Sequence, residues 1–211
     1  LYTSTNGDSW TNNTGWPSNA YEWDSITSID QVVGWHGITA TNGDITQIDL
    51  SSRGLSGSLP GSIGDLSRLT FINLNYNAIS GNIPDEIGNL SNLKTLRLYG
   101  NQFSGPVPLE ICNLTKLTGL ILGGNALTGI IPSEIGNLTN LTDLRIDANQ
   151  LNGSIPSTIG NLNKLTTLSL KENQLTGNLP PELGNLVQLQ YLYLRYNKLS
   201  GTLPSELSNL T

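Results

Sequence analysis

Residues 141–164 read LTDLRIDANQLNGSIPSTIGNLNK, and the same spacing of leucine, asparagine, glycine and proline recurs along most of the chain. Counting outward from this stretch, units of 24 residues follow one another without insertion or deletion, and only the last unit ends one residue short. A fixed period of this length is typical of solenoids, in which each unit buries its apolar residues against its neighbours. The seven units are residues 45–68, 69–92, 93–116, 117–140, 141–164, 165–188 and 189–211.

The positions within each unit predict its local structure. Leu144 and Ile146, the fourth and sixth residues of their unit, are two residues apart and face one side of a short strand. An asparagine at the ninth position of six units can satisfy backbone groups of neighbouring turns, and a glycine at the thirteenth position of all seven units permits a tight turn. We therefore expect an α/β repeat solenoid whose strands stack into one parallel, concave β-sheet.

The segment L-x-G-x-[IL]-P in these units resembles the plant-type subclass of the leucine-rich repeat family, and this resemblance covers residues 45–211. Residues 1–44 resemble the N-terminal cap of that subclass, with WHGIT at Trp35–Thr39. Caps of relatives usually carry a cysteine pair, but Ala40 stands where its second member would be, so we expect tryptophan packing to hold this cap together. The resemblance implies a right-handed leucine-rich-repeat superhelix and an extracellular or cell-surface recognition module without enzymatic activity.

The charge of the chain excludes several classes of partner. The 211 residues carry a net charge of −6, and residues 1–44 hold five acidic and no basic residues. The repeats are almost neutral, with eleven acidic against ten basic residues. Nucleic acids and anionic membranes require a basic surface, so neither is an expected partner. No apolar run reaches the roughly 18 residues that a bilayer requires, so we expect no membrane segment in this chain.

The concave face is the expected binding surface. Strand residues at positions 3, 5, 7 and 8 of each unit point to it, whereas the leucines point inward. Aromatic and arginine side chains dominate binding hot spots, although tyrosine is also simply a good strand former. The middle of the face is expected to be bare, with small residues and an exposed Ile121. The candidate ligand-binding residues are Phe71, Tyr76, Arg97, Tyr99, Arg145, Tyr191, Tyr193, Arg195 and Tyr196.

Groups that could perform catalysis are sparse. Asp143 and Asp147 flank Arg145, and we expect these charges to neutralise one another rather than bind a metal or act as acid and base. Cys112, the only cysteine, replaces a glycine that recurs at position 20, and His36 is more than three units away in the sequence. We expect a small buried thiol without a histidine to activate it. No catalytic residue, metal site or cofactor is predicted, and we do not expect an enzyme.

Seven asparagines stand in the acceptor pattern for N-glycosylation, Asn-x-Ser/Thr. Four of them share position 21 of their units and would form one row along the solenoid: Asn89, Asn113, Asn137 and Asn209. The other three are Asn12, Asn140 and Asn152. The pattern indicates either a line of glycans on a secreted protein or a by-product of the G-N-L-[ST] consensus of the repeat.

Three functions are compatible with these features. The first is recognition of a protein, a peptide or a cell-wall glycan on the concave face. The second is a glycosylated extracellular fibre assembled head to tail by self-association, because the chain stops at Thr211 without the polar cap that normally closes a solenoid. The third is ice binding by a row of threonines at position 2, which Lys94 and Gln190 interrupt. The row consists of Thr46, Thr70, Thr118, Thr142 and Thr166.

Overall fold

The computed structural model describes Ser9 and residues 35–210. The candidate glycosylation site Asn12 and three of the four tryptophans expected to hold the cap lie outside the described residues. The fourth tryptophan, Trp35, is partly buried and packs against the hydrophobic core. Packing of this one tryptophan agrees with the expectation for the cap.

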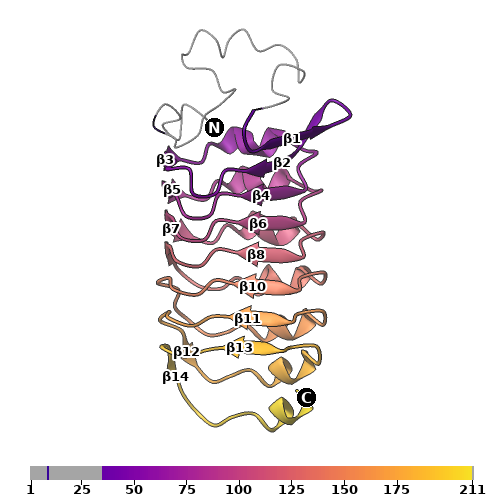
Figure 1. Ribbon diagram of the computed structural model, residues 1–211. Helices are drawn as coiled ribbons and strands as arrows, with labels where there is room; N and C mark the ends of the chain where they lie inside the picture. Colours follow the sequence, from indigo (N-terminus) through magenta and orange to yellow (C-terminus); the bar gives the residue numbers. More distant parts are fainter. Residues whose placement is uncertain (1–8, 10–34, 211) are drawn as a thin grey trace.

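The described chain forms a stack of coils, each of which contributes one short strand to a common sheet (Figure 1). From β2 onward the strands are parallel, and residues one unit apart pair with each other: Leu144 pairs with Leu120 on one side and with Leu168 on the other. The predicted solenoid with a parallel sheet is therefore confirmed. In spatial order the sheet consists of β1 (Ile38–Thr41), β2 (Asp44–Asp49), β4 (Phe71–Asn73), β6 (Thr95–Arg97), β8 (Gly119–Ile121), β10 (Asp143–Arg145), β11 (Thr167–Ser169) and β13 (Tyr191–Tyr193).

An antiparallel hairpin forms the N-terminal edge of this sheet. Strand β1 pairs with β2 through a turn at Asn42 and Gly43, whose φ angles are 52° and 81°. Positive φ at both central residues is the geometry of the two-residue turns that suit a hairpin. Strand β1 thereby covers the backbone edge that the first repeat would otherwise expose.

A second strand of two to five residues in most units forms small sheets beside the large one. One small sheet has the order β3-β5-β7-β9 and another consists of β12 and β14 (Figure 1). Their bounds are β3 (Ser56–Ser58), β5 (Ala78–Asn82), β7 (Gln102–Pro106), β9 (Ala126–Thr128), β12 (Thr176–Gly177) and β14 (Lys198–Leu199). These strands were not predicted, because segments of two to five residues with mixed polarity leave no periodic signal.

Each coil is completed by a five-residue 3-10 helix on its outer side. Each helix begins after the proline at position 16 and ends before the leucine at position 22, so it is too short for a stable α-helix. No helix among the described residues is long and apolar enough to cross a bilayer. The helices are η4 (Gly61–Asp65), η5 (Asp85–Asn89), η6 (Leu109–Asn113), η7 (Ser133–Asn137), η8 (Ser157–Asn161), η9 (Pro181–Asn185) and η10 (Ser205–Asn209).

The asparagines at position 9 join neighbouring coils, as predicted. The Nδ2 of Asn149 donates to the backbone oxygens of Ile146 and Leu122, each at 3.2 Å, and its Oδ1 accepts the backbone N–H of Leu127 at 3.0 Å. The same pattern recurs at the asparagines of the other units. Because each amide serves two coils, the row of asparagines is part of the scaffold and is not available to a ligand.

The recurring glycine of position 20 explains how closely the 3-10 helices stack. A Cβ built on Gly160 would lie only 2.5 Å from the backbone oxygen of Glu182 in the next helix. Cys112 stands at this position in η6 and is 1% exposed, so the predicted buried thiol is confirmed. Burial, and after it the charges of Glu134 and Glu110, raises the pKa of the Cys112 thiol to about 11. A thiol of that pKa stays protonated at neutral pH and is a poor nucleophile.

Candidate ligand-binding groove

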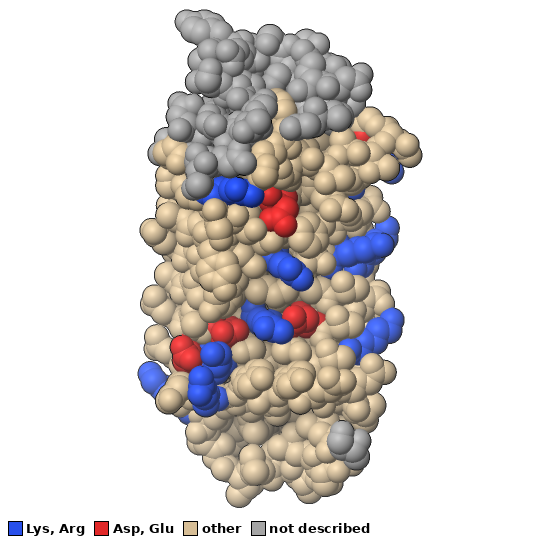
Figure 2. Space-filling model, in the orientation of Figure 1, with Lys and Arg blue, Asp and Glu red and all other residues tan. Residues whose placement is uncertain are grey.

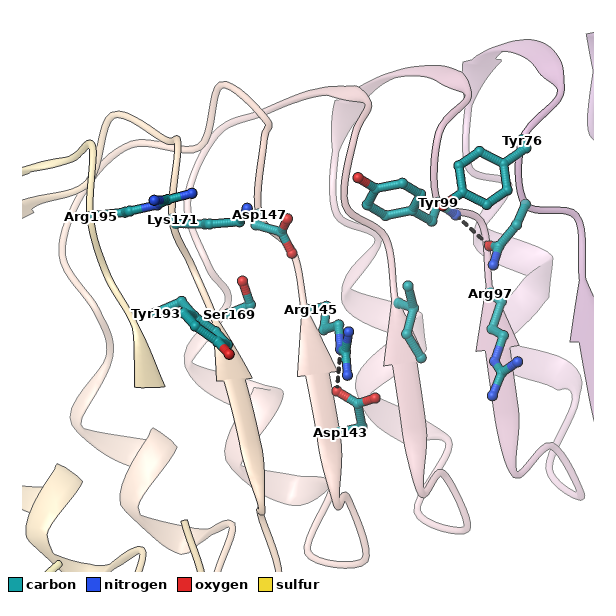
Figure 3. A pocket seen from close by; sticks show the side chains of 12 residues that line it. Tyr76, Arg97, Tyr99, Asp143, Arg145, Asp147, Ser169, Lys171, Tyr193 and Arg195 are labelled. Carbon is teal, nitrogen blue, oxygen red and sulfur yellow. Dashed lines mark hydrogen bonds and ion pairs between the residues drawn. The ribbon is translucent and has the colours of Figure 1, made fainter. Parts of the chain in front are cut away.

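A groove with a volume of about 700 Å³ runs along the large sheet on its concave face. Basic and acidic side chains gather along the middle of the strand-bearing face (Figure 2), and the close-up view shows how they project from successive strands (Figure 3). Positions 5 and 7 of the second to seventh units supply most of the lining. The concave groove is lined by Asn75, Tyr76, Arg97, Tyr99, Ile121, Asp143, Arg145, Asp147, Ser169, Lys171, Tyr193 and Arg195.

Two tyrosines form a fixed aromatic surface near the N-terminal end of the groove. The rings of Tyr76 and Tyr99 meet edge to face, with centroids 5.4 Å apart and planes inclined by 69°. Glycines make room for both rings: a Cβ on Gly100 would lie 3.0 Å from Tyr76, and one on Gly123 would lie 3.1 Å from Tyr99. Tyr76 is 63% exposed. Its backbone φ is 57°, a value that residues other than glycine seldom adopt. The residue at position 8 has a positive φ in all seven units, from Ser52 to Tyr196, so this conformation belongs to the turn of the repeat.

Arg97 lies beside these rings and supplies a positive charge. Its guanidinium carbon is 5.7 Å from the centroid of the Phe71 ring, which is the range of a cation–π contact. Among the described residues, no carboxylate pairs with Arg97. The backbone next to this site is fixed by Asn75, whose Oδ1 accepts the N–H of Tyr99 at 2.8 Å. The groove therefore offers one cation without a carboxylate partner next to two ordered rings.

The prediction that Ile121 is exposed is wrong. Ile121 is 9% exposed and forms the floor of the groove. In the sheet it pairs with Arg97 on one side and Arg145 on the other. The long apolar stems of arginines readily cover such a neighbour while their charged ends reach solvent. The middle of the face is therefore an apolar floor between two arginines rather than a bare surface.

The charges in the middle of the groove neutralise one another only in part. Arg145 Nε donates to Asp143 Oδ1 at 2.8 Å, and this hydrogen bond, opposed by partial burial, raises the pKa of Arg145 above its ordinary value. The Asp147 carboxylate forms no hydrogen bond or ion pair with any described residue, but its charge also contributes to raising the pKa of Arg145. Within the described part of the chain, no group of three histidine, cysteine or acidic side chains is arranged to hold a metal ion.

Tyrosine and arginine recur at the C-terminal end of the face. The rings of Tyr191 and Tyr193 are nearly parallel, with centroids 6.3 Å apart and planes inclined by 7°. The guanidinium carbon of Arg195 lies 5.2 Å from the centroid of Tyr196, a ring that is 70% exposed. Glu172 lies 3.5 Å from Lys171 Nζ and 4.0 Å from Arg195, so one carboxylate serves two cations.

Most of the residues predicted to bind a ligand do line the groove: Tyr76, Arg97, Tyr99, Arg145, Tyr193 and Arg195. The other three predicted residues lie beside the lining. Phe71 is covered by Arg97, Tyr191 stacks on Tyr193, and Tyr196 contacts Arg195. Ser169 was not predicted, although position 5 of its unit places it on this face, because a small buried serine carries no signal for binding.

The candidate glycosylation sites lie away from the groove. The asparagines of position 21 are exposed and end the 3-10 helices η5, η6, η7 and η10 on the outer side. Asn152 is also exposed. Asn140 differs, because it is half-buried and its Nδ2, the atom that would carry a glycan, donates to the backbone oxygen of Thr115 at 2.9 Å.

The threonines of position 2 form a row fixed by hydrogen bonds between units. Each hydroxyl donates to the backbone oxygen of the position-2 residue in the preceding unit, at 2.9 to 3.1 Å. The donors are Thr70, Thr118, Thr142 and Thr166. These bonds restrict the side-chain rotamers and give the hydroxyls the regular spacing of the strands. Exposed Lys94 interrupts this row, as predicted from the sequence.

Family models match most of the repeat region. Residues 48–153, half of the 211-residue chain, match a model described as a leucine-rich repeat region, and residues 139–199 match a second model described as leucine-rich repeat. A search among curated proteins gave no significant match.

Three solved structures resemble the chain closely. The PEPR1–AtPEP1 complex is 33% identical with a TM-score of 0.86, and the match covers 100% of this chain and 30% of that one. The Arabidopsis receptor kinase HAESA, in complex with the peptide hormone IDA and the co-receptor SERK1, is 28% identical with a TM-score of 0.74. That match covers 90% of this chain and 36% of the other. A plant ice-binding protein is 29% identical with a TM-score of 0.76, covering 100% and 80%. The chain thus spans about a third of the first two proteins and most of the third.

Proposed function

This chain belongs to the leucine-rich repeat family, and we propose that its concave groove binds an extended peptide segment of a partner protein without catalysing a reaction. The observation that carries the proposal is the groove itself, in which side chains from six successive units face one continuous space and four of these units supply tyrosines or arginines. Aromatic rings and arginines held in place before binding reduce the entropy lost when a ligand is bound.

The kind of partner follows from the similar structures. The HAESA structure contains a peptide hormone and a co-receptor protein, and its repeats superpose on those of this chain. An extended peptide that crosses the strands meets a new unit about every 4.8 Å, so each unit can contact one or two of its residues. An extracellular or cell-surface setting belongs to the same proposal, because HAESA is a hormone receptor.

The test is selection of binders from a random dodecapeptide library displayed on phage, followed by titration of the selected peptides. Replacing Tyr76 and Tyr193 together by alanine is expected to weaken binding by about 30-fold or more, because aromatic hot-spot residues typically contribute at least about 2 kcal/mol. The matched control is Leu109→Ala, which removes an exposed apolar side chain from η6 on the outer side and should leave affinity unchanged. If no selected peptide depends on the two tyrosines, peptide recognition by the groove is refuted. Binding of a cell-wall polysaccharide in place of any peptide would identify a glycan ligand instead.

A second candidate function is ice binding, which we propose for the threonine row at position 2. Two observations favour it: the similarity to a plant ice-binding protein extends over most of both chains, and the threonine hydroxyls are regularly spaced and held by hydrogen bonds. Regular, rigid hydroxyl rows can order water on one face of a solenoid.

An ice-recrystallisation assay checks this second candidate. The wild-type protein is expected to inhibit recrystallisation, and Thr118→Lys with Thr142→Lys should abolish the effect, because two further lysines would break the row. The control is Thr115→Lys with Thr139→Lys, which adds the same charges at exposed positions outside the row. A wild-type protein without activity, or equal activity in both variants, contradicts the candidate.

A further inference from the structure

Asp147 is an acidic side chain held in the floor of the groove without a partner. It lies two residues after β10 at position 7 of its unit and is only 6% exposed. Asn75, at the same position three units earlier, accepts the N–H of Tyr99, but no described donor bonds to the Asp147 carboxylate. In the close-up view this carboxylate lies between the side chains of Lys171 and Tyr99 (Figure 3).

Three cations of the groove form ion pairs with carboxylates other than Asp147, although the charge of Asp147 acts on Arg145 at longer range. Arg145 donates a hydrogen bond to Asp143, and Lys171 and Arg195 both lie within ion-pair distance of Glu172. The Asp147 side chain is largely covered, but its carboxylate oxygens reach the groove, because among the described residues Arg53 Nε is the only fully buried side-chain polar atom without a hydrogen bond. An unpaired carboxylate that faces a groove is therefore suited to a cation that arrives with the ligand.

The surroundings of the carboxylate add a second feature that favours a cation. A Cβ built on Gly123 would lie 3.1 Å from Asp147 Oδ1 and 3.1 Å from Cδ2 of Tyr99, so the carboxylate and the ring border the same spot of the groove floor. Gly123 itself adds no side chain there. A positive group above Gly123 would meet a negative charge on one side and an aromatic ring on the other.

We propose that Asp147, Tyr99 and Gly123 form a subsite for a cationic group of the bound peptide, namely a lysine or arginine side chain or the N-terminal ammonium. This inference rests on the proposed function, because it assigns the chemistry of one residue of the ligand. The cation would lie above Gly123, which is one unit from Arg97, or about 5 Å across the strands, and two positions further along the strand. Arg97 and Asp147 together would select a segment that carries an acidic and a basic group close to each other.

The first measurement uses the dodecapeptides that the wild-type protein selects from the phage library. Asp147→Asn is expected to weaken their binding by about 10- to 100-fold, because it removes one member of a partly desolvated charge pair. The control, Asp85→Asn, makes the same change of charge at an exposed residue of η5 outside the groove and should leave affinity unchanged. Two changes to the peptide identify the cation. Acetylation of the N-terminus weakens binding if the N-terminal ammonium occupies the subsite, and replacement of the lysine or arginine by norleucine weakens it if the side chain does.

The second measurement needs no ligand. Because Asp147 forms no hydrogen bond within the protein, the free Asp147→Asn variant is expected to melt within about 2 °C of the wild type in a calorimetric scan. A clearly lower melting temperature would show that Asp147 stabilises the fold through partners within the protein, and it overturns the proposal. Peptides that depend on Tyr76 and Tyr193 but bind Asp147→Asn as tightly as wild type overturn the subsite and leave the proposed function intact. The absence of any peptide that depends on those tyrosines overturns both.

Discussion

Replacing Asn125 by leucine is expected to lower the free energy of unfolding by about 4 kcal/mol or more. The Asn125 amide donates to the backbone oxygens of Leu98 and Leu122, each at 3.0 Å, and accepts the backbone N–H of Phe103 at 3.0 Å. Leucine leaves these groups unpaired inside the solenoid, where each unsatisfied group costs about 1–3 kcal/mol. A loss of this size is a large part of the total stability of a domain, which is about 5–15 kcal/mol.

Urea unfolding followed by circular dichroism measures this change. The control is Asn137→Leu, the same substitution at an exposed residue of η7, which should change stability by no more than about 0.5 kcal/mol. Asn125→Ser keeps a small polar group that can still form one of these hydrogen bonds, so it should fall between the two. This variant keeps the prediction testable if the leucine variant does not fold. Equal stability of Asn125→Leu and Asn137→Leu would contradict the role given to the asparagine row.

Gly160→Ala is expected to cost about 2–3 kcal/mol, because the added methyl group would collide with the next coil. Its Cβ would lie 2.5 Å from the Glu182 backbone oxygen and 2.6 Å from the Glu182 Cβ. The backbone cannot withdraw without separating η8 from η9, and overpacking of this kind typically costs about 1–3 kcal/mol. The φ angle of Gly160 lies outside the positive range, so the effect is steric rather than conformational.

Gly119→Ala is the matched control for this steric effect. Gly119 is also buried, but the nearest atom to its Cβ would be 3.5 Å away, which is ordinary contact, and its φ is not positive. Thermal and urea unfolding should therefore show Gly119→Ala within about 0.5 kcal/mol of the wild type. If Gly160→Ala is equally harmless, close packing does not explain the glycine at position 20.

The repeat made the scaffold predictable. The spacing of Leu144 and Ile146 indicated a strand, and the recurrence of that pair 24 residues away indicated a parallel neighbour. The asparagine of position 9 was expected to bond to adjacent turns and does so. These features depend only on positions that repeat in every unit, so one unit predicts the others.

The groove was predictable only in part. Position within the unit placed Tyr76, Arg97 and Tyr193 on the concave face correctly. Position within the unit did not show that Ile121 is buried. Its burial depends on the residues that pair with it in the neighbouring strands, Arg97 and Arg145. Ser169 carries no distinguishing chemistry in the sequence, and only the shape of the groove includes it.

The sequence by itself determined the architecture, because a 24-residue period fixes which residues face the core, the turn and the concave surface of every coil. The tertiary structure decided which of the surface charges pair. Asp143 and Asp147 stand on either side of Arg145 in the sequence, yet Arg145 bonds only to Asp143, while Asp147 faces Tyr99 across Gly123. The physical reason is that the partners of a side chain in a solenoid come from neighbouring coils, about two dozen residues away, and only the stacked structure brings them together.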